Sequence, residues 1–110
     1  MTYPSMPIKI LTHRWVVRFL PDKKFSSDDQ AITIPYDREI HFRRSKTNLE
    51  DIIHELTHAY LDEVGLGNSA QLQPDQMEEV YCELTSKHGF TLLLQAADIY
   101  RAYQQLKKRS

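Results

Sequence analysis

Residues 47–64 read TNLEDIIHELTHAYLDEV and form the most strongly patterned part of this 110-residue chain. Apolar side chains recur there every three or four residues, which is the spacing of one face of an α-helix. They are Leu49, Ile52, Ile53, Leu56, Tyr60 and Val64. Thr47 followed by Glu50 has the spacing of a capping box, and Gly65 is a residue type that commonly ends helices. The pattern predicts an amphipathic helix between Thr47 and Gly65.

This predicted helix contains an HExxH motif at residues 54–58. His54 and His58 are four residues apart, so their imidazoles lie one turn apart on the same face and can bind one ion. Zinc binds imidazole nitrogen at about 2.0–2.1 Å, a distance that two histidines at this spacing can reach. Glu55 begins about 100° further around the helix, where its side chain can reach a metal-bound water as a general base. The motif predicts a hydrolytic zinc site.

The sequence before this helix is typical of β-strands. Residues 13–20 are rich in β-branched and aromatic side chains and are followed by Pro21, which favours a strand that stops there. Residues 31–34 and 39–43 alternate apolar and polar side chains on either side of a short turn, which predicts a hairpin with Ile40 and Phe42 facing the core. We expect a short, mainly antiparallel three-stranded sheet.

The sequence after the motif predicts a second, longer helix. Asp75 followed by Glu78 repeats the capping spacing, and an apolar stripe continues to Leu106. Its members are Met77, Val80, Leu84, Leu92, Ala96, Ile99, Tyr103 and Leu106. Gly89 interrupts this helix, so that one kinked helix and two consecutive helices are both open. The fold class is α+β, and residues 1–110 are expected to form one domain.

A catalytic zinc site needs three protein ligands, so the two motif histidines do not complete it. The candidates for the third ligand are His41, His88, Glu78, Glu79 and Glu83. Spacing alone leaves Glu78 and Glu79 both open, because one residue rotates a helical side chain by about 100°. His41 is expected on the outward face of the hairpin strand just before the motif helix. Tyr36, Tyr60 and Tyr81 are each able to donate a hydrogen bond to a developing oxyanion.

The segment HELTHAY at residues 54–60, with acidic residues on the next helix, resembles the gluzincin class of metallopeptidases. The chain is similar to minigluzincins and short phage-encoded HExxH proteins, and more distantly to SprT-like and ImmA/IrrE-type peptidases. The resemblance implies a zincin-like fold and hydrolysis of peptide bonds with Glu55 as the general base. It also implies that Glu79 is the third zinc ligand and that Glu83 supports a ligand histidine from outside the metal shell. In zincins the strand before the motif helix commonly pairs with extended substrate, a role in which His41 would line the cleft.

Composition and charge set the expected partners. The formal net charge is −1, with nine Lys or Arg against six Asp or Glu in residues 1–50 and five against nine in residues 51–110. The short basic stretches 43–46 and 107–109 lack interleaved aromatic residues, which favours solvated surface over nucleic-acid binding. No basic leader or long apolar run is present, and the single Cys82 precludes an internal disulfide. We expect a cytoplasmic protein that acts on peptides, with no nucleic-acid or membrane partner.

Two other functions fit the same residues. The first is a catalytically inactive zinc-binding domain that recognises a protein partner, which its small size favours. The second is a metal-free helical interaction module in which HExxH is coincidental and the last helix presents Tyr103 and Leu106 to a partner. A thermal melt that is insensitive to zinc and chelator favours the second.

Overall fold

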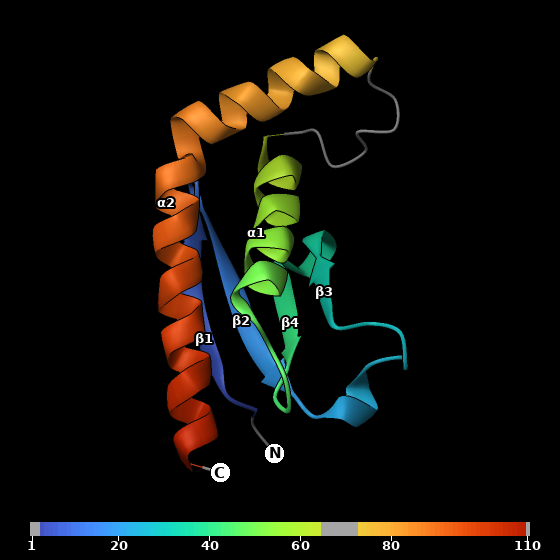
Figure 1. The fold of residues 1–110 in the computed structure, drawn as a ribbon, viewed down its shortest axis with the longest axis vertical. Helices are drawn as coiled ribbons and strands as arrows, with labels where there is room; N and C mark the ends of the chain where they lie inside the picture. The colour runs from blue at the N-terminus through green and yellow to red at the C-terminus, as the bar shows by residue number, and fades with distance from the viewer. Residues whose placement is uncertain (1–2, 65–72, 110) are drawn as a thin grey trace.

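The computed structural model describes residues 3–64 and 73–109, which fold into one sheet and two helices (Figure 1). The strands are β1 (Ser5–Ile10), β2 (His13–Leu20), β3 (Ala31–Ile34) and β4 (Glu39–Arg43). The helices are α1 (Leu49–Glu63) and α2 (Pro74–Arg109), and two short 3-10 helices are η1 (Asp22–Lys24) and η2 (Pro35–Asp37). The predicted α+β class is confirmed.

The sheet differs from the predicted one in two respects. Its strand order is β1-β2-β4-β3, so it has four strands where three were predicted. The central pair, β2 and β4, is parallel, whereas β1–β2 and β3–β4 are antiparallel. The prediction of a mainly antiparallel three-stranded sheet is therefore wrong in its number of strands and did not include the parallel central pair, although the β3–β4 hairpin and all three predicted strands are confirmed.

The additional strand, β1, lies at one edge of the sheet. It contains Pro7, opposite Val16 of β2. Proline has no N–H to donate, so its presence argues against a strand with two neighbours, but an edge strand needs hydrogen bonds on one side only. This edge position explains why the sequence of β1 does not read as a strand although the chain pairs there.

Both helices cover one face of the sheet and enclose the core (Figure 1). The sheet contributes Ile10, Trp15, Val17, Phe19, Ile40 and Phe42, all between 0 and 2% exposed. Helix α1 contributes chiefly Ile52, Leu56, Ala59 and Tyr60, and α2 contributes Leu92, Ala96, Ile99 and Tyr103. Each large apolar side chain buried in this way contributes about 1.5–3 kcal/mol. The core fixes which face of α1 is left for other contacts.

Helix α1 begins one residue later than the capping box predicts. Asn48 is its N-cap, and the Asn48 side chain accepts a hydrogen bond from the backbone N–H of Asp51 at 2.8 Å. Thr47 is instead buried and donates its hydroxyl to the carbonyl oxygen of Arg43 at 2.7 Å. The predicted Thr47 cap is therefore wrong. The predicted stop at Gly65 lies outside the described residues, and α1 itself ends at Glu63.

Helix α2 is one continuous helix of 36 residues, and its ribbon bends sharply part-way along (Figure 1). This resolves the open choice at Gly89 in favour of a single bent helix. We refer to residues 74–88 as the first stretch of α2 and to residues 89–109 as the second stretch. Five of the eight predicted stripe residues are buried, and four of these five belong to the second stretch. Within the described part of the chain, no helix is long and apolar enough to cross a membrane.

Candidate metal centre and the adjoining groove

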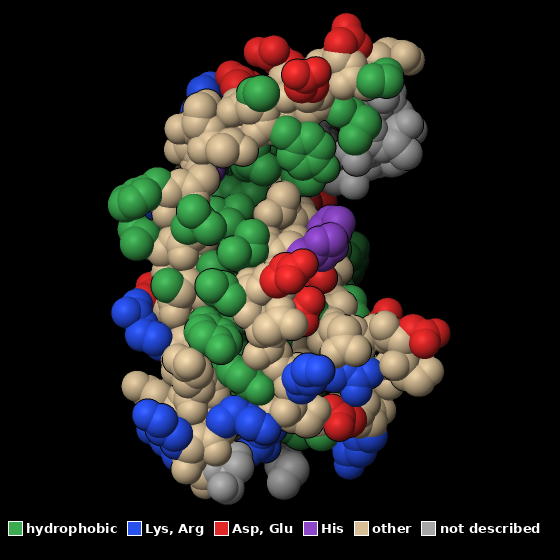
Figure 2. Space-filling view, viewed as in Figure 1, with side chains coloured by type: hydrophobic (Ala, Val, Ile, Leu, Met, Phe, Trp, Pro, Cys, Tyr) green, Lys and Arg blue, Asp and Glu red, His purple; other side chains and the backbone are tan. Residues whose placement is uncertain are grey.

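The two motif histidines lie together on the exposed side of α1. The Nε2 atoms of His54 and His58 are 3.1 Å apart, and their rings meet edge to face with centroids 4.7 Å apart. Two ligands of a tetrahedral zinc bound at 2.0–2.1 Å lie about 3.3 Å apart. The pair therefore has the spacing of two zinc ligands. Figure 2 shows histidine at the surface over α1, directly beside acidic side chains.

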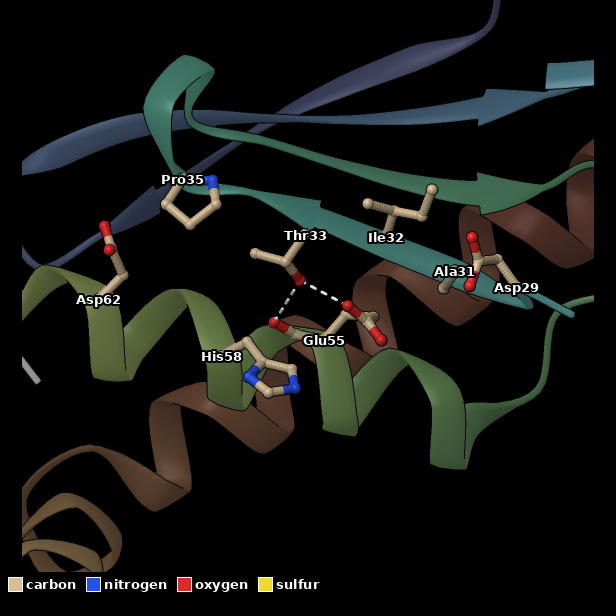
Figure 3. A pocket seen from close by; sticks show the side chains of 8 residues that line it. All are labelled: Asp29, Ala31, Ile32, Thr33, Pro35, Glu55, His58 and Asp62. Atoms are coloured by element: carbon tan, nitrogen blue, oxygen red, sulfur yellow. Dashed lines mark hydrogen bonds between the residues drawn. The ribbon is translucent and has the colours of Figure 1, made fainter. Parts of the chain in front are cut away.

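Glu55 points from α1 toward β3 rather than into solvent (Figure 3). Its Oε1 atom accepts a hydrogen bond from the hydroxyl of Thr33 at 2.6 Å, and the same hydroxyl lies 3.1 Å from the carbonyl oxygen of Glu55. Thr33 thus fixes the direction of the predicted general base. No sequence signal links Thr33 to Glu55, because the two residues are 22 positions apart and meet only when the sheet packs on α1.

The predicted third ligand is not brought to the histidine pair. Among residues 3–64 and 73–109, no group of three His, Cys, Asp or Glu side chains converges as a metal site would require. Glu78, Glu79 and Glu83 are all exposed on the first stretch of α2. The Glu83 carboxylate instead pairs with Lys87 at 2.9 Å. Among the described residues, His54 and His58 therefore have the arrangement of two zinc ligands, and no third ligand lies beside them.

Tyr81 is the residue of α2 that shares a hollow with the histidine pair. This hollow has a volume of about 350 Å³ and is also lined by His54, Thr57 and His58. Along a helix, Glu79 lies about 160° from Tyr81 and Glu78 about 60° from it. Glu79 consequently faces away from the histidines, whereas Glu78 lies at the flank and shares a second hollow with Tyr81.

The other two candidate tyrosines lie elsewhere. Tyr36 is 97% exposed, and the buried Tyr60 donates its hydroxyl to Gln95 at 2.6 Å. Burial raises the pKa of Tyr60 above its ordinary value. Of the three tyrosines considered as oxyanion donors, Tyr81 is the one that lies beside the motif.

The two further histidine candidates do not reach the pair. His41 alternates with the buried Ile40 and Phe42, so it lies on the sheet face opposite the helices. Its Nε2 atom is 2.8 Å from Glu39. Hydrogen bonds from Arg18 and then His41 hold the pKa of Glu39 below its ordinary value. His88 packs against the ring of Tyr60, with centroids 5.8 Å apart.

The cleft-lining role that the zincin resemblance implies for His41 is not met in the structure, because the strand of His41 is not at the edge of the sheet. β4 lies between β2 and β3, and β3 is the edge strand. A groove of about 440 Å³ runs between β3 and α1 (Figure 3). Three consecutive residues of the strand, 31–33, line it. Because successive side chains of a strand point to opposite faces, this run indicates that the free backbone edge of β3 borders the groove.

A buried carboxylate fixes the far end of α1. The side chain of Glu63 is 5% exposed and accepts hydrogen bonds from Trp15 Nε1 at 2.5 Å and Arg38 Nε at 2.8 Å. The Nδ1 atom of His13 lies 3.1 Å away. Burial by itself raises the pKa of Glu63, but hydrogen bonds from Arg38 and Trp15 outweigh it and hold the pKa below its ordinary value. Glu63 thereby ties α1 to β2 and to the turn before β4.

Comparison with protein-family models, with curated proteins and with solved structures finds no match to this chain.

Proposed function

We propose that the chain is a zinc-dependent peptidase in which His54 and His58 hold the metal and Glu55 is the general base. The observation that carries this proposal is the 3.1 Å separation of the two Nε2 atoms on the exposed side of α1, beside the β3 groove. When bound, zinc supplies a Lewis acid that polarises a carbonyl and lowers the pKa of a water. The resemblance of the HELTHAY segment to gluzincins supports the same chemistry.

Glu55 is well placed to move a proton at the edge of the groove. A general base must lie within hydrogen-bond reach of the proton that it takes, and the Glu55 carboxylate lines the groove. The hydroxyl of Thr33 holds one oxygen of this carboxylate and leaves the other without a hydrogen bond from the described residues. We therefore assign Thr33 as a positioning residue for the base.

The free edge of β3 supports the binding of an extended substrate. Main-chain N–H and C=O groups at a sheet edge pair with an added strand, which gives affinity without a deep pocket. A peptide paired with β3 would pass over Glu55 and His58, since both line the same groove as residues 31–33. This arrangement favours peptide bonds as the substrate class.

We further propose Glu79 as the third ligand, with Glu83 supporting a ligand histidine and Glu78 as the alternative third ligand. Either glutamate must turn toward the histidines, and Glu78 requires the smaller rotation. Among residues 74–88 the described structure buries Leu84 alone, so few packing contacts oppose such a rearrangement. Substituting each glutamate separately distinguishes the two.

The test is the Glu55→Gln variant, which keeps the shape of the side chain and removes its basicity. We expect it to bind zinc like the parent and to lose about 10²- to 10⁴-fold in peptide hydrolysis. The measurement is turnover of a quenched fluorescent peptide library, with zinc content determined in parallel and chelator-treated protein as the control. Full activity of Glu55→Gln would contradict the role of this residue.

A catalytically inactive recognition domain is the second candidate. It is favoured by the absence of a third converging ligand among the described residues. The same peptide library separates the two candidates, because a recognition domain binds peptides in the groove without cleaving them at any zinc concentration.

A further inference from the structure

The groove between β3 and α1 carries acidic side chains along its length. Figure 3 places Asp29 toward one end, Asp62 toward the other and Glu55 between them. Among the described residues that line the groove, none is Lys or Arg. A cleft lined by one sign of charge raises the local concentration of ligands of the opposite sign.

Among the described residues, no Lys or Arg forms an ion pair with any of these three carboxylates. The Asp62 carboxylate makes no hydrogen bond or ion pair with the described residues, and the Glu55 carboxylate accepts only from the neutral Thr33 hydroxyl. Asp29 accepts from the hydroxyl of Ser26 at 2.8 Å. The guanidinium of Arg43 donates to the main-chain oxygen of Asp29 at 2.7 Å and forms its ion pair with the carboxylate of Asp22. Within the described part of the chain, the groove carboxylates therefore form no ion pair with Lys or Arg, although Arg43 lies beside the Asp29 end.

The spacing of the acids suits an extended chain. A strand rises about 3.3 Å per residue, so a peptide that pairs with β3, residues 31–34, covers about 10 Å along the groove. Asp62 lies seven positions after Glu55 on α1, which is about 10 Å along the helix. In a bound peptide, the side chains before and after the peptide bond over Glu55 would therefore lie near Asp29 on one side and Asp62 on the other. The three carboxylates do not converge on a point, so the pattern fits a spread of cationic side chains better than one metal ion.

We infer that this groove selects extended peptides that carry Lys or Arg on both sides of a central bond, with Asp29 and Asp62 contacting the two cationic side chains. The inference rests on the proposed function, because it takes a peptide paired with β3 as the occupant. It adds the substrate class, which the HExxH motif does not specify.

The experiment measures binding to the metal-free full chain, so that it does not depend on hydrolysis. Two short fluorescent peptides are compared by anisotropy, one with lysine on both sides of a central dipeptide and one with glutamine at the same positions. We expect the lysine peptide to bind more tightly, and more weakly as salt is raised. Asp29→Asn and Asp62→Asn should each weaken its binding by about two- to five-fold, the range for exposed charge pairs.

The matched control is Asp98→Asn, which removes the same charge from α2, outside the groove, where Asp98 pairs with Arg101. It should leave the affinity for the lysine peptide unchanged, as should all three variants for the glutamine peptide. Equal binding of the two peptides, no binding of either, or equal effects of the Asp98 and groove variants would each overturn the inference.

Hydrolysis is then tested separately on zinc-loaded protein. A preference for the lysine peptide without cleavage would refute the proposed peptidase activity and leave the inferred specificity standing. Cleavage of both peptides at equal rates, with no charge preference in binding, would refute the specificity and leave the peptidase standing.

Discussion

Helix α1 and the first stretch of α2 are held to the rest of the molecule very differently. In α1, Ile52, Leu56 and Ala59 are each 0% exposed, whereas Leu84, at 7%, is the one buried residue among residues 74–88. The difference separates the candidate metal centre into two parts. The histidines come from a helix whose rotation is fixed by the core, and the proposed third ligand comes from a stretch that the core barely fixes.

The ends of α1 strengthen this contrast. Asn48 caps its first turn, and Glu63 joins its last turn to Trp15 and Arg38. Preformed ligands lower the cost of binding a metal, since less of the chain must be ordered. The histidine pair is therefore the preformed part of the candidate metal centre. The first stretch of α2 would have to turn for its glutamate to reach a zinc ion held by that pair.

The most severe test of this contrast compares two leucine truncations. Leu56→Ala removes a fully buried side chain of α1 and should reduce the free energy of unfolding by about 2–5 kcal/mol. Leu84→Ala is the matched change in the first stretch of α2 and should cost less, about 1–2 kcal/mol, because a lightly packed site can relax. Urea unfolding measures both. Equal losses would show that the two helices are held equally well.

A smaller effect is expected at Glu63. Its pKa is lowered in the folded state, so its contribution to stability is present above the unfolded pKa of 4.5 and is lost as the pH falls through the folded pKa. Glu63→Gln should therefore cost about 1–3 kcal/mol at neutral pH and should lose less stability than the parent on acidification below that value. Urea midpoints across this pH range measure the effect.

Glu83→Gln is the matched control for Glu63, because the Glu83 carboxylate is exposed in its pair with Lys87. It should change stability little and should keep the pH dependence of the parent. If Glu63→Gln behaves like this control, the buried contacts of Glu63 do not anchor α1.

Sequence patterns predicted the local elements better than their assembly. Period-two and period-3.6 patterns placed β2, β3, β4 and α1, because these patterns report which side of each element is buried. They did not predict that β2 and β4 are parallel, since strand pairing depends on contacts between residues that are far apart in the chain. The sequence did not predict β1 because this strand contains Pro7, which cannot donate a backbone hydrogen bond. An edge strand tolerates the proline, since it pairs on one side only.

For the candidate metal centre too, the sequence predicted what one helix determines and not what the packing between elements determines. The i, i+4 spacing of His54 and His58 is a property of one helix, and the structure brings the pair together. Thr33 and Tyr81 enter the site through packing between elements, so no local pattern could identify them as neighbours of the motif. The third ligand depends on the rotation of α2, which a one-residue change in phase alters by about 100°.

Zinc per chain is the measurement that tests the central claim most directly. Elemental analysis is made on protein purified without chelator or histidine tag, for the parent, for Glu79→Ala and for Glu78→Ala, so that the two candidate third ligands are distinguished. The account predicts about one equivalent in the parent, a loss or weakening of zinc in Glu79→Ala, and retention in Glu78→Ala. No zinc in the parent, even after incubation with added metal, would contradict it and would make the HExxH motif a coincidence of helix composition.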